Sequence, residues 1–380
     1  MLARRCLAAT ANGSQHLQCA AGLSQLSSSA YGVAGGGAAS AAVGGGRCYA
    51  GSAGSGGEAP ADIRKAFAYC VEQVKKHDYE NYLWVTQLPK PLRAPIFALR
   101  AFNVETGLIS QQAKSEMLVL MRCQQWWRDA VNDCFKGRPP EQPVVTALAE
   151  VLRVVPLTRY RLQQMVSTRE EDLLAHAQPA SLEAVERYAE GTSGQLLLLQ
   201  LEAARIGAGS AGAGGGSSSD DGSGSTPSSG SSPAGGGGGA AAAAEHGAAH
   251  LGKAVGIVGL LRGTYALGSQ RRVYLPADLC QRHGVGDEDV LAGRDSPGLR
   301  DVTLAVASAA KQHLDDARRL AADVAPAARP LFAPAVAAAM YLQALEQAGF
   351  NLFDQRMLRG AFSPLAYQLR LKWALLRNSY

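Results

Sequence analysis

The first 57 residues of this 380-residue chain contain no aspartate or glutamate, so all 32 acidic residues lie beyond them. The segment is instead rich in alanine, glycine and serine and carries three arginines. This composition is typical of an organelle transit peptide, and the lack of a compact apolar core beside a basic start argues against a secretory signal. Arg47 precedes the Tyr49–Ala50 bond as in a matrix-protease site. We therefore expect residues 1–49 to be a mitochondrial transit peptide, with a plastid as the alternative destination.

Cysteine is also scarce. Beyond the expected transit peptide the chain has only Cys70, Cys123, Cys134 and Cys280. No two of these have the spacing of a metal site, and four thiols in a chain of this length do not form a disulfide framework. We interpret them as core or half-buried thiols in a reducing compartment.

Long apolar runs and concentrated charge are missing too. No window reaches the roughly 18 to 20 uninterrupted apolar residues that a membrane-spanning helix needs, which predicts a soluble or peripheral protein. The chain has 37 basic and 32 acidic residues, and the three arginines of the transit peptide account for much of the difference. The basic residues that remain are scattered rather than striped, so we expect no nucleic-acid partner.

Strand signals are few, and from residue 62 onward apolar residues recur at spacings of three and four, the period of a helix. In 144–155 they form one stripe, which Pro156 ends. The sequence predicts helices near 62–76, 91–111, 114–135, 144–155, 157–173, 181–206, 246–264, 298–324, 328–348 and 363–377. We therefore expect an all-α domain over 62–377.

Residues 207–244 interrupt the helical pattern. They are almost wholly glycine, serine and alanine, and only Asp220 and Asp221 are charged. Such a tract cannot bury enough apolar surface to offset the entropy lost on ordering. We expect a long disordered loop that joins two helices of the same domain.

Several ordered motifs resemble those of the squalene/phytoene synthase family. They are the opening segment 82–102, Arg122 with Trp126-Trp127-Arg128, the small-residue segment 188–194, and 250–276, which ends in Arg272-Val273-Tyr274-Leu275-Pro276. The resemblance covers about 62–377. It implies an isoprenoid-synthase-type helical bundle around a central cavity, with small residues in 188–194 allowing close packing.

The acid groups of this family's two motifs are missing. In active members aspartates follow the first helix and close the second motif, whereas the corresponding residues here are Gly107, Leu108, Gln111, Gly263 and Leu267. Magnesium needs oxygen ligands and usually takes carboxylates for them. We therefore expect a pseudoenzyme with no catalytic residue, no metal and no cofactor.

The resemblance is strongest to a divergent mitochondrial branch of the family. It implies a non-catalytic role in assembling respiratory complex I (NADH:ubiquinone oxidoreductase), on the matrix side of the inner membrane. The expected partners are complex I subunits or assembly intermediates, with a lipid in the cavity or a peripheral membrane contact. The C-terminal segment 362–380 mixes leucines with basic residues, so it either rests on an anionic membrane surface or simply packs. The alternative function is an active prenyltransferase acting on prenyl diphosphates, with ligands among Glu105, Glu190, Asp315 and Asp316.

Candidate residues for a vestigial pocket or binding site are Glu105, Trp127, Arg128, Tyr188, Arg262, Arg272 and Tyr274. Arg262 is the best retained, because a guanidinium presents five donors that suit phosphate or carboxylate. The competing interpretation of Arg262 is an ion pair with Glu105 or Glu190. Of Trp126 and Trp127, we expect one to pack inward while the other shields a groove.

Other polar residues have simpler interpretations. We interpret the pair Asp315-Asp316 and the cluster Glu170-Glu171-Asp172 as solvated helix faces, because neighbouring residues on a helix point in different directions. The histidines, including His176, His250, His283 and His313, are interpreted as ordinary residues without paired metal-ligand spacing.

Overall fold

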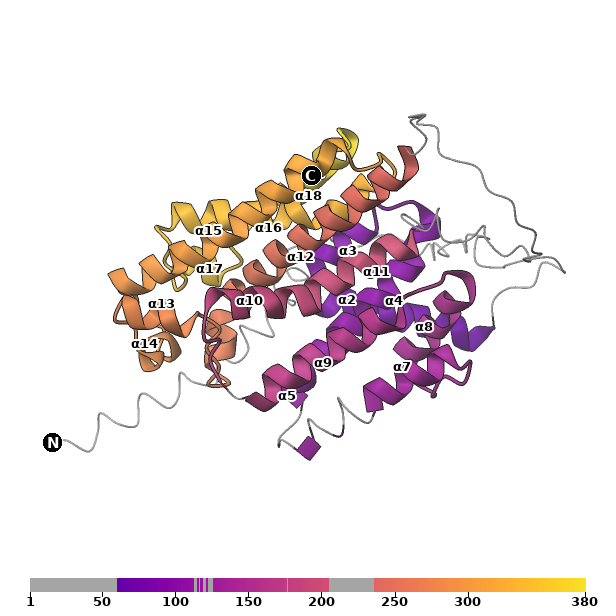
Figure 1. Ribbon diagram of the computed structural model, residues 1–380, viewed down its shortest axis with the longest axis horizontal. Coiled ribbons are helices and arrows are strands. Elements are labelled where there is room, and N and C mark those ends of the chain that lie inside the picture. The colour runs from indigo at the N-terminus through magenta and orange to yellow at the C-terminus, as the bar shows by residue number, and fades with distance from the viewer. Residues whose placement is uncertain are drawn as a thin grey trace, which may run out of the picture.

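The computed structural model describes residues 60–112, 115, 117–118, 121, 126–175, 177–204 and 236–380. Every regular element in this part of the chain is a helix, which confirms the predicted all-α class (Figure 1). The expected transit peptide, Arg122 and Cys123, His176, and residues 207–235 of the expected loop lie outside the described residues.

The main elements of the N-terminal half are α-helices and the π-helical turn η2. They are α2 (Ala61–His77), α3 (Tyr79–Val85), α4 (Lys90–Gly107), α5 (Ile109–Gln112), α7 (Arg128–Phe135), α8 (Pro143–Val154), α9 (Arg159–Ala175), α10 (Leu182–Ala189), η2 (Glu190–Gly194) and α11 (Gln195–Ala203). Most agree with the predicted ranges. The predicted helix 181–206 is instead α10, the π-helical turn η2 and α11 in succession.

The C-terminal half follows from residue 236. Its elements are α12 (Gly236–Gly268), α13 (Ala277–Arg282), α14 (Asp287–Leu291), α15 (Pro297–Arg319), η3 (Leu320–Ala322), η4 (Arg329–Phe332), α16 (Pro334–Gln347), α17 (Gln355–Leu358) and α18 (Pro364–Leu376). Our expected end of the loop at 244 is wrong, because 236–244 already belong to α12. The run Ala240–Ala244 explains this, since alanine has the highest intrinsic helix propensity.

Local chemistry explains several helix starts. At the start of α8 the Gln142 side chain accepts a hydrogen bond from the Val145 amide, and at the start of α15 the Ser296 hydroxyl accepts one from Leu299. A proline is the first residue of both helices. Because proline lacks the amide hydrogen that would be unpaired there, and the cap satisfies another, these starts are well defined.

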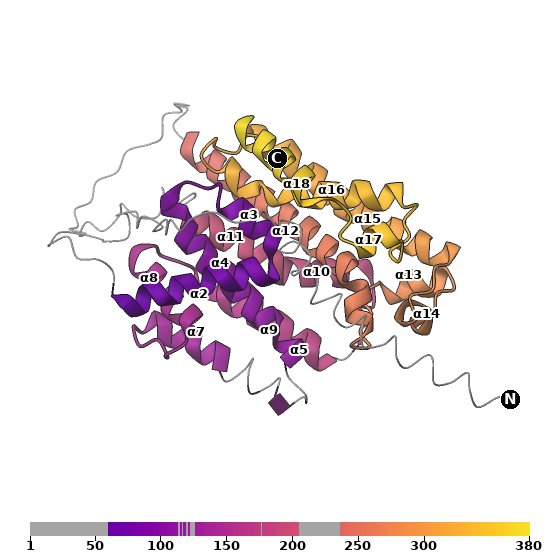
Figure 2. The ribbon, with the colours of Figure 1, turned by 180° about the vertical axis from the view of Figure 1, so that it is seen from behind.

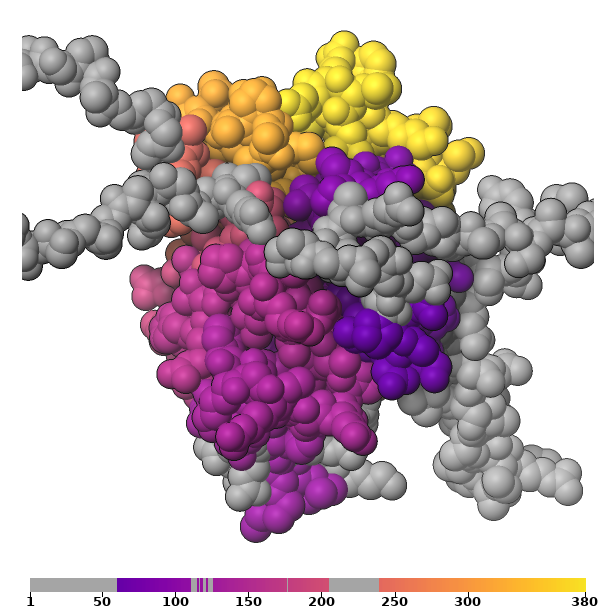
Figure 3. Space-filling view, turned by 90° about the vertical axis from the view of Figure 1, so that its right-hand side faces the viewer, coloured from indigo at the N-terminus to yellow at the C-terminus, as the bar shows by residue number. Residues whose placement is uncertain are grey.

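Helix α12 runs through the middle of the molecule, between the N-terminal helices and the C-terminal group α15–α18 (Figures 1 and 2). It packs against α10, η2 and α11 on one side and against α15 and α16 on the other. Seen from the side, the orange and yellow C-terminal residues lie above the indigo and magenta N-terminal ones (Figure 3). The two halves therefore meet along α12.

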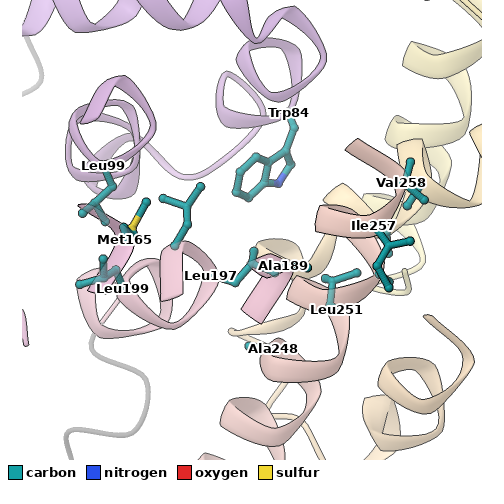
Figure 4. Close-up of a cluster of buried hydrophobic side chains, with 14 of the residues drawn as sticks. Trp84, Leu99, Met165, Ala189, Leu197, Leu199, Ala248, Leu251, Ile257 and Val258 are labelled. Carbon is teal, nitrogen blue, oxygen red and sulfur yellow. The ribbon is translucent and has the colours of Figure 1, made fainter. Parts of the chain in front are cut away.

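One buried apolar cluster includes residues from both halves. Figure 4 shows part of it, with Trp84 of α3 and Leu197 of α11 near Leu251 of α12. Trp84 is fully buried, and its indole nitrogen donates to the carbonyl of Pro330, 2.8 Å away, in the C-terminal half. Buried indole groups need such a partner. None of the helices in the described residues has the length and apolarity to cross a lipid bilayer.

Small residues set the distance between α12 and η2. A Cβ atom placed on Gly252 would lie 2.3 Å from the Cα of Gly194, and one on Gly256 would lie 2.5 Å from the Cβ of Ala189. Both distances are too short for real atoms, so these positions require glycine while the helices stay this close. The expected close packing around 188–194 is confirmed.

Candidate functional site

A cavity of about 350 Å³ lies between α4, α11, α12 and α16, beside the junction of α2 and α3. Its volume is within the range of small-molecule sites. Its polar lining consists of His77, Asp78, Glu80, Asn81, Arg100, Asn103, Arg169, Ser193 and Arg262. The remaining lining is mostly apolar, including Leu196, Leu197, Val255, Val258 and Ala338. The cavity thus combines a charged region with an apolar one.

Arg262 of α12 forms a two-pronged ion pair with Glu80 at the start of α3. Its Nη1 and Nη2 atoms lie 2.6 and 2.8 Å from the two carboxylate oxygens of Glu80. The guanidinium also lies over the rings of Tyr341 and Phe362, at 5.7 and 5.9 Å from their centroids. This parallel geometry is the strongest that an arginine makes with a carboxylate.

We expected Arg262 to pair with Glu105 or Glu190, and this expectation was wrong. Glu105 accepts a hydrogen bond from the Tyr69 hydroxyl at 2.7 Å, and Glu190 pairs with Lys253 at 3.0 Å. Neither lines the cavity with Arg262. Glu80 has this place because the junction of α2 and α3 brings it against α12, a contact across 182 residues of sequence.

The second acid of the cavity is held in the same way. Asp78 accepts a hydrogen bond from Arg100, at 3.1 Å, and another from Asn81. Arg100 is only 4% exposed and lies over the Trp84 ring, 5.0 Å from its centroid. Burial lowers the pKa of Arg100, although Asp78 opposes this shift. Both acids that line the cavity are therefore neutralised by an arginine.

A third arginine, Arg169 of α9, is buried beside the cavity. It donates to the Thr106 hydroxyl at 2.7 Å and to the Asn103 side-chain oxygen at 2.6 Å. We expected its neighbours Glu170 and Asp172 to lie on a solvated face, and this was wrong. Glu170 is buried and pairs with Arg128 at 2.9 Å. The helical spacing could have predicted this burial, because positions 169 and 170 continue the buried stripe of α9.

Asp172 is the centre of a separate cluster that contains three of the candidate residues. Arg272 donates to its carboxylate and to its main-chain oxygen, both at 2.9 Å, and the Tyr274 hydroxyl donates to the carboxylate at 2.5 Å. The Tyr188 ring lies 5.8 Å from that of Tyr274. Burial raises the pKa of Asp172, while Tyr274 and Arg272 oppose the shift. The cluster joins α9 to the segment after α12.

The remaining candidates lie in other places. Trp127 is buried and packs edge-on against Phe102, with ring centroids 5.3 Å apart, whereas Trp126 is 39% exposed. This confirms that one tryptophan packs inward. Arg128 donates to Ser167 as well as pairing with Glu170. Of the seven candidate residues, the structure therefore places Arg262 alone in the cavity lining.

The residues that line the cavity do not fit a divalent metal. Gly107 and Leu108, two of the positions that the family resemblance assigns to missing acids, are in the lining and carry no side-chain oxygen. The cavity acids Asp78 and Glu80 come from the same junction and already bind arginines. The four acids of the prenyltransferase alternative, Glu105, Glu190, Asp315 and Asp316, are not in the lining. Magnesium needs carboxylate oxygens that can turn toward it.

The fold and this cavity define a class of protein: the chain belongs to the squalene/phytoene synthase family, whose model matches residues 74–363. Within that class it is similar to the NADH dehydrogenase (ubiquinone) complex I, assembly factor 6 of Bos taurus. The two are 36% identical over 291 residues, which cover 77% of each chain. The protein of the same name from Homo sapiens is 34% identical over 285 residues, 75% of each chain.

Solved structures of synthases share the fold. A dehydrosqualene synthase superposes with a TM-score of 0.63 at 19% identity, covering 83% of this chain and 98% of that one. A squalene synthase from Alicyclobacillus acidocaldarius gives a TM-score of 0.59 at 18% identity, covering 77% and 97%. These comparisons confirm the isoprenoid-synthase type of fold.

Proposed function

We propose that this chain is a non-catalytic assembly factor for mitochondrial respiratory complex I, built on a degenerate prenyl-synthase scaffold. Its similarity to the proteins named complex I assembly factor 6 supports the assembly role. The observation that carries the non-catalytic part is the cavity itself, in which both lining acids are bound to arginines. An acid-free N-terminal segment supports import into mitochondria.

The chemistry of prenyl transfer explains why this observation matters. Cleavage of a prenyl diphosphate depends on positioning and on metal cations that stabilise the leaving diphosphate. A metal that recruited Glu80 or Asp78 would have to displace Arg262 or Arg100 and leave that charge unpaired. Such a loss costs about 3–5 kcal/mol for a buried pair, a figure that applies to Arg100–Asp78 and is smaller for the part-exposed Arg262–Glu80. The cavity is therefore better suited to binding than to diphosphate ionisation.

The cavity and the surface offer two ways of binding. The apolar part of the lining, with the arginines beside it, suits a lipid or a partner segment that has an apolar body and an anionic or polar end. Helix α18 has an exposed apolar stripe of Leu365, Leu369, Trp373 and Leu376, flanked by basic residues. This stripe supports peripheral contact with the anionic matrix face of the inner membrane.

Loss of the gene tests the proposed function. Cells without this chain should have less assembled complex I on native gels, and unchanged amounts of squalene, sterol and carotenoid precursors. The wild-type gene should restore complex I. Normal complex I together with altered isoprenoid precursors would instead establish the prenyltransferase alternative.

A direct assay tests the non-catalytic part separately. Purified protein with magnesium and either farnesyl or geranylgeranyl diphosphate should give no condensed product above a heat-denatured control. The variant Gly263→Asp/Leu267→Asp should stay inactive as well, because the opposite wall at Gly107 and Leu108 still lacks carboxylates. Magnesium-dependent condensation by the wild-type protein would refute this proposal.

A further inference from the structure

A group of metal-ligand side chains lies outside the central cavity, where α12, α15 and α10 meet. It consists of His246 and His250 on α12, His313 and Asp316 on α15, and Glu186 on α10. His246 and His250 are four residues apart on one helix, a ligand spacing that we wrongly took to be absent among the histidines. His250 precedes Arg262 by 12 residues, about 18 Å along a helix. The group is thus separate from the cavity.

Three of these residues bring one possible ligand atom each close together. The Nδ1 atoms of His250 and His313 are 3.0 Å apart, and the Oδ2 atom of Asp316 is 3.8 Å from the Nδ1 of His250. All three atoms lie within 4.8 Å of one another. Two ligands of a tetrahedral zinc ion, each about 2.0–2.1 Å from it, are about 3.3 Å apart. The observed separations are close to that value.

The outward-facing nitrogens of both imidazoles have partners. The Nε2 atom of His313 is 3.5 Å from the carboxylate of Glu186. The Nε2 atom of His250 is 3.2 Å from the Nε2 atom of His246. A metal-binding histidine usually donates its second nitrogen to a carboxylate or another acceptor, which fixes the tautomer and turns the other lone pair to the metal. Glu186 and His246 stand in these positions.

The tautomers of the two histidines decide how this contact is satisfied. If one ring carries its proton on Nδ1, it donates to the other Nδ1 across 3.0 Å. With both protons on Nε2, as the partners Glu186 and His246 allow, the two Nδ1 atoms and the Asp316 oxygen are three acceptors without a donor. The other oxygen of Asp316 is paired with Arg319, which holds the carboxylate in place. A cation between these three acceptors would satisfy all three groups.

We propose that His250, His313 and Asp316 bind a divalent transition metal of the zinc type, with water as the fourth ligand. Two imidazoles and a carboxylate suit such borderline ions and do not suit magnesium, which prefers oxygen ligands throughout. Glu186 and His246 are positioning residues that orient the two ligand histidines. Because the ligands come from α12 and α15, the metal fastens the N-terminal part of α12 to α15.

Calorimetry with tag-free protein tests the site. Zinc chloride should bind the wild-type protein with a stoichiometry of one, and magnesium chloride in excess should not compete. His250→Gln and His313→Gln should abolish this binding. The matched control His283→Gln should leave it unchanged, because His283 faces Asp301 at a different place on the surface.

Two further measurements distinguish a built site from chance affinity. Glu186→Gln should weaken zinc binding by about 10- to 100-fold, the effect typical of a lost outer-shell partner. Cobalt(II) should give the intense visible absorption of a four-coordinate site in the wild type and lose it in His313→Gln. Circular dichroism would establish that each variant is folded. The proposal is overturned if the folded His250→Gln/His313→Gln double variant binds zinc as tightly as the wild type.

Discussion

At the scale of single residues, Trp126 and Trp127 are neighbours in sequence with opposite environments. The Trp127 ring packs edge-on against both Phe102 and Trp126, with centroid distances of 5.3 and 4.7 Å. Trp127 is 5% exposed and belongs to the core, whereas Trp126 is 39% exposed. Trp127 was one of our candidates for a vestigial pocket or binding site. Its burial shows that a substitution there would act first on stability.

Trp127→Ala should therefore destabilise the fold strongly. Removing a buried tryptophan costs about 3–5 kcal/mol in free energy of unfolding, because apolar area is lost and a cavity remains. Trp126→Ala should cost under about 1 kcal/mol, as is usual for surface substitutions. Urea denaturation of both variants measures the difference, and equal losses of stability would contradict this account.

Residues of the candidate site were only partly predictable from the sequence. The sequence motif singled out Arg262, and the structure places it in the cavity lining. Its partner Glu80 was not predicted, since a pairing over 182 residues depends on how α3 meets α12. Glu170 was misjudged because charged residues were assumed to be solvated. The helical stripe from Leu162 to Leu173 already placed it inside.

At the scale of elements, the close contact between α12 and η2 depends on glycines, which have no side chain to separate the two helices. Gly252→Ala should destabilise the protein by about 1–3 kcal/mol, the usual cost of overpacking, because its Cβ would lie 2.3 Å from the Cα of Gly194. The matched control is Gly259→Ala on the same helix, where a Cβ would meet nothing within 4 Å. That change should be neutral or stabilise by up to about 1 kcal/mol, because alanine favours the helix. Thermal melts of both variants test this, and a stabilising Gly252→Ala would refute the close packing.

The helices themselves were largely predictable, and their interruptions were less so. The spacing of apolar residues found most helices to within a few residues. It missed the π-helical turn Glu190–Gly194, because one widened turn hardly changes a period read over many residues. It also joined η4 to α16 across Pro334, although a proline at the first position of a helix is a regular start signal.

At the scale of the whole molecule, the exposed stripe on α18 gives one face an apolar band beside basic charge. Tyr367 and Leu371 bury the opposite side of this helix, so the stripe is additional to its packing. Arg377 lies over the Trp373 ring, 4.3 Å from its centroid. An apolar band with basic residues on its flanks is the arrangement by which helices bind anionic lipid surfaces.

Binding to vesicles tests the role of this face. Wild-type protein should sediment with vesicles that contain 30% cardiolipin and 70% phosphatidylcholine, and much less with phosphatidylcholine alone. Leu369→Glu/Trp373→Glu should abolish the sedimentation, because charged groups replace the apolar contact. The matched control Leu304→Glu changes an exposed leucine on α15 and should bind as the wild type does. Equal sedimentation of all three proteins would exclude α18 as the membrane contact.

The arginine–carboxylate pairs of the cavity also bear on whether a metal site could evolve there. To bind a metal in this cavity, a variant would have to acquire new acids or release Asp78 or Glu80 from Arg100 or Arg262. Each intermediate with one partner lost leaves an unpaired charge, at a cost of about 3–5 kcal/mol where the pair is buried. Typical domains have only about 5–15 kcal/mol of total stability. Under the proposed non-catalytic function, the two pairs therefore act as a barrier, because a lineage that gained a metal in this cavity would pass through less stable intermediates.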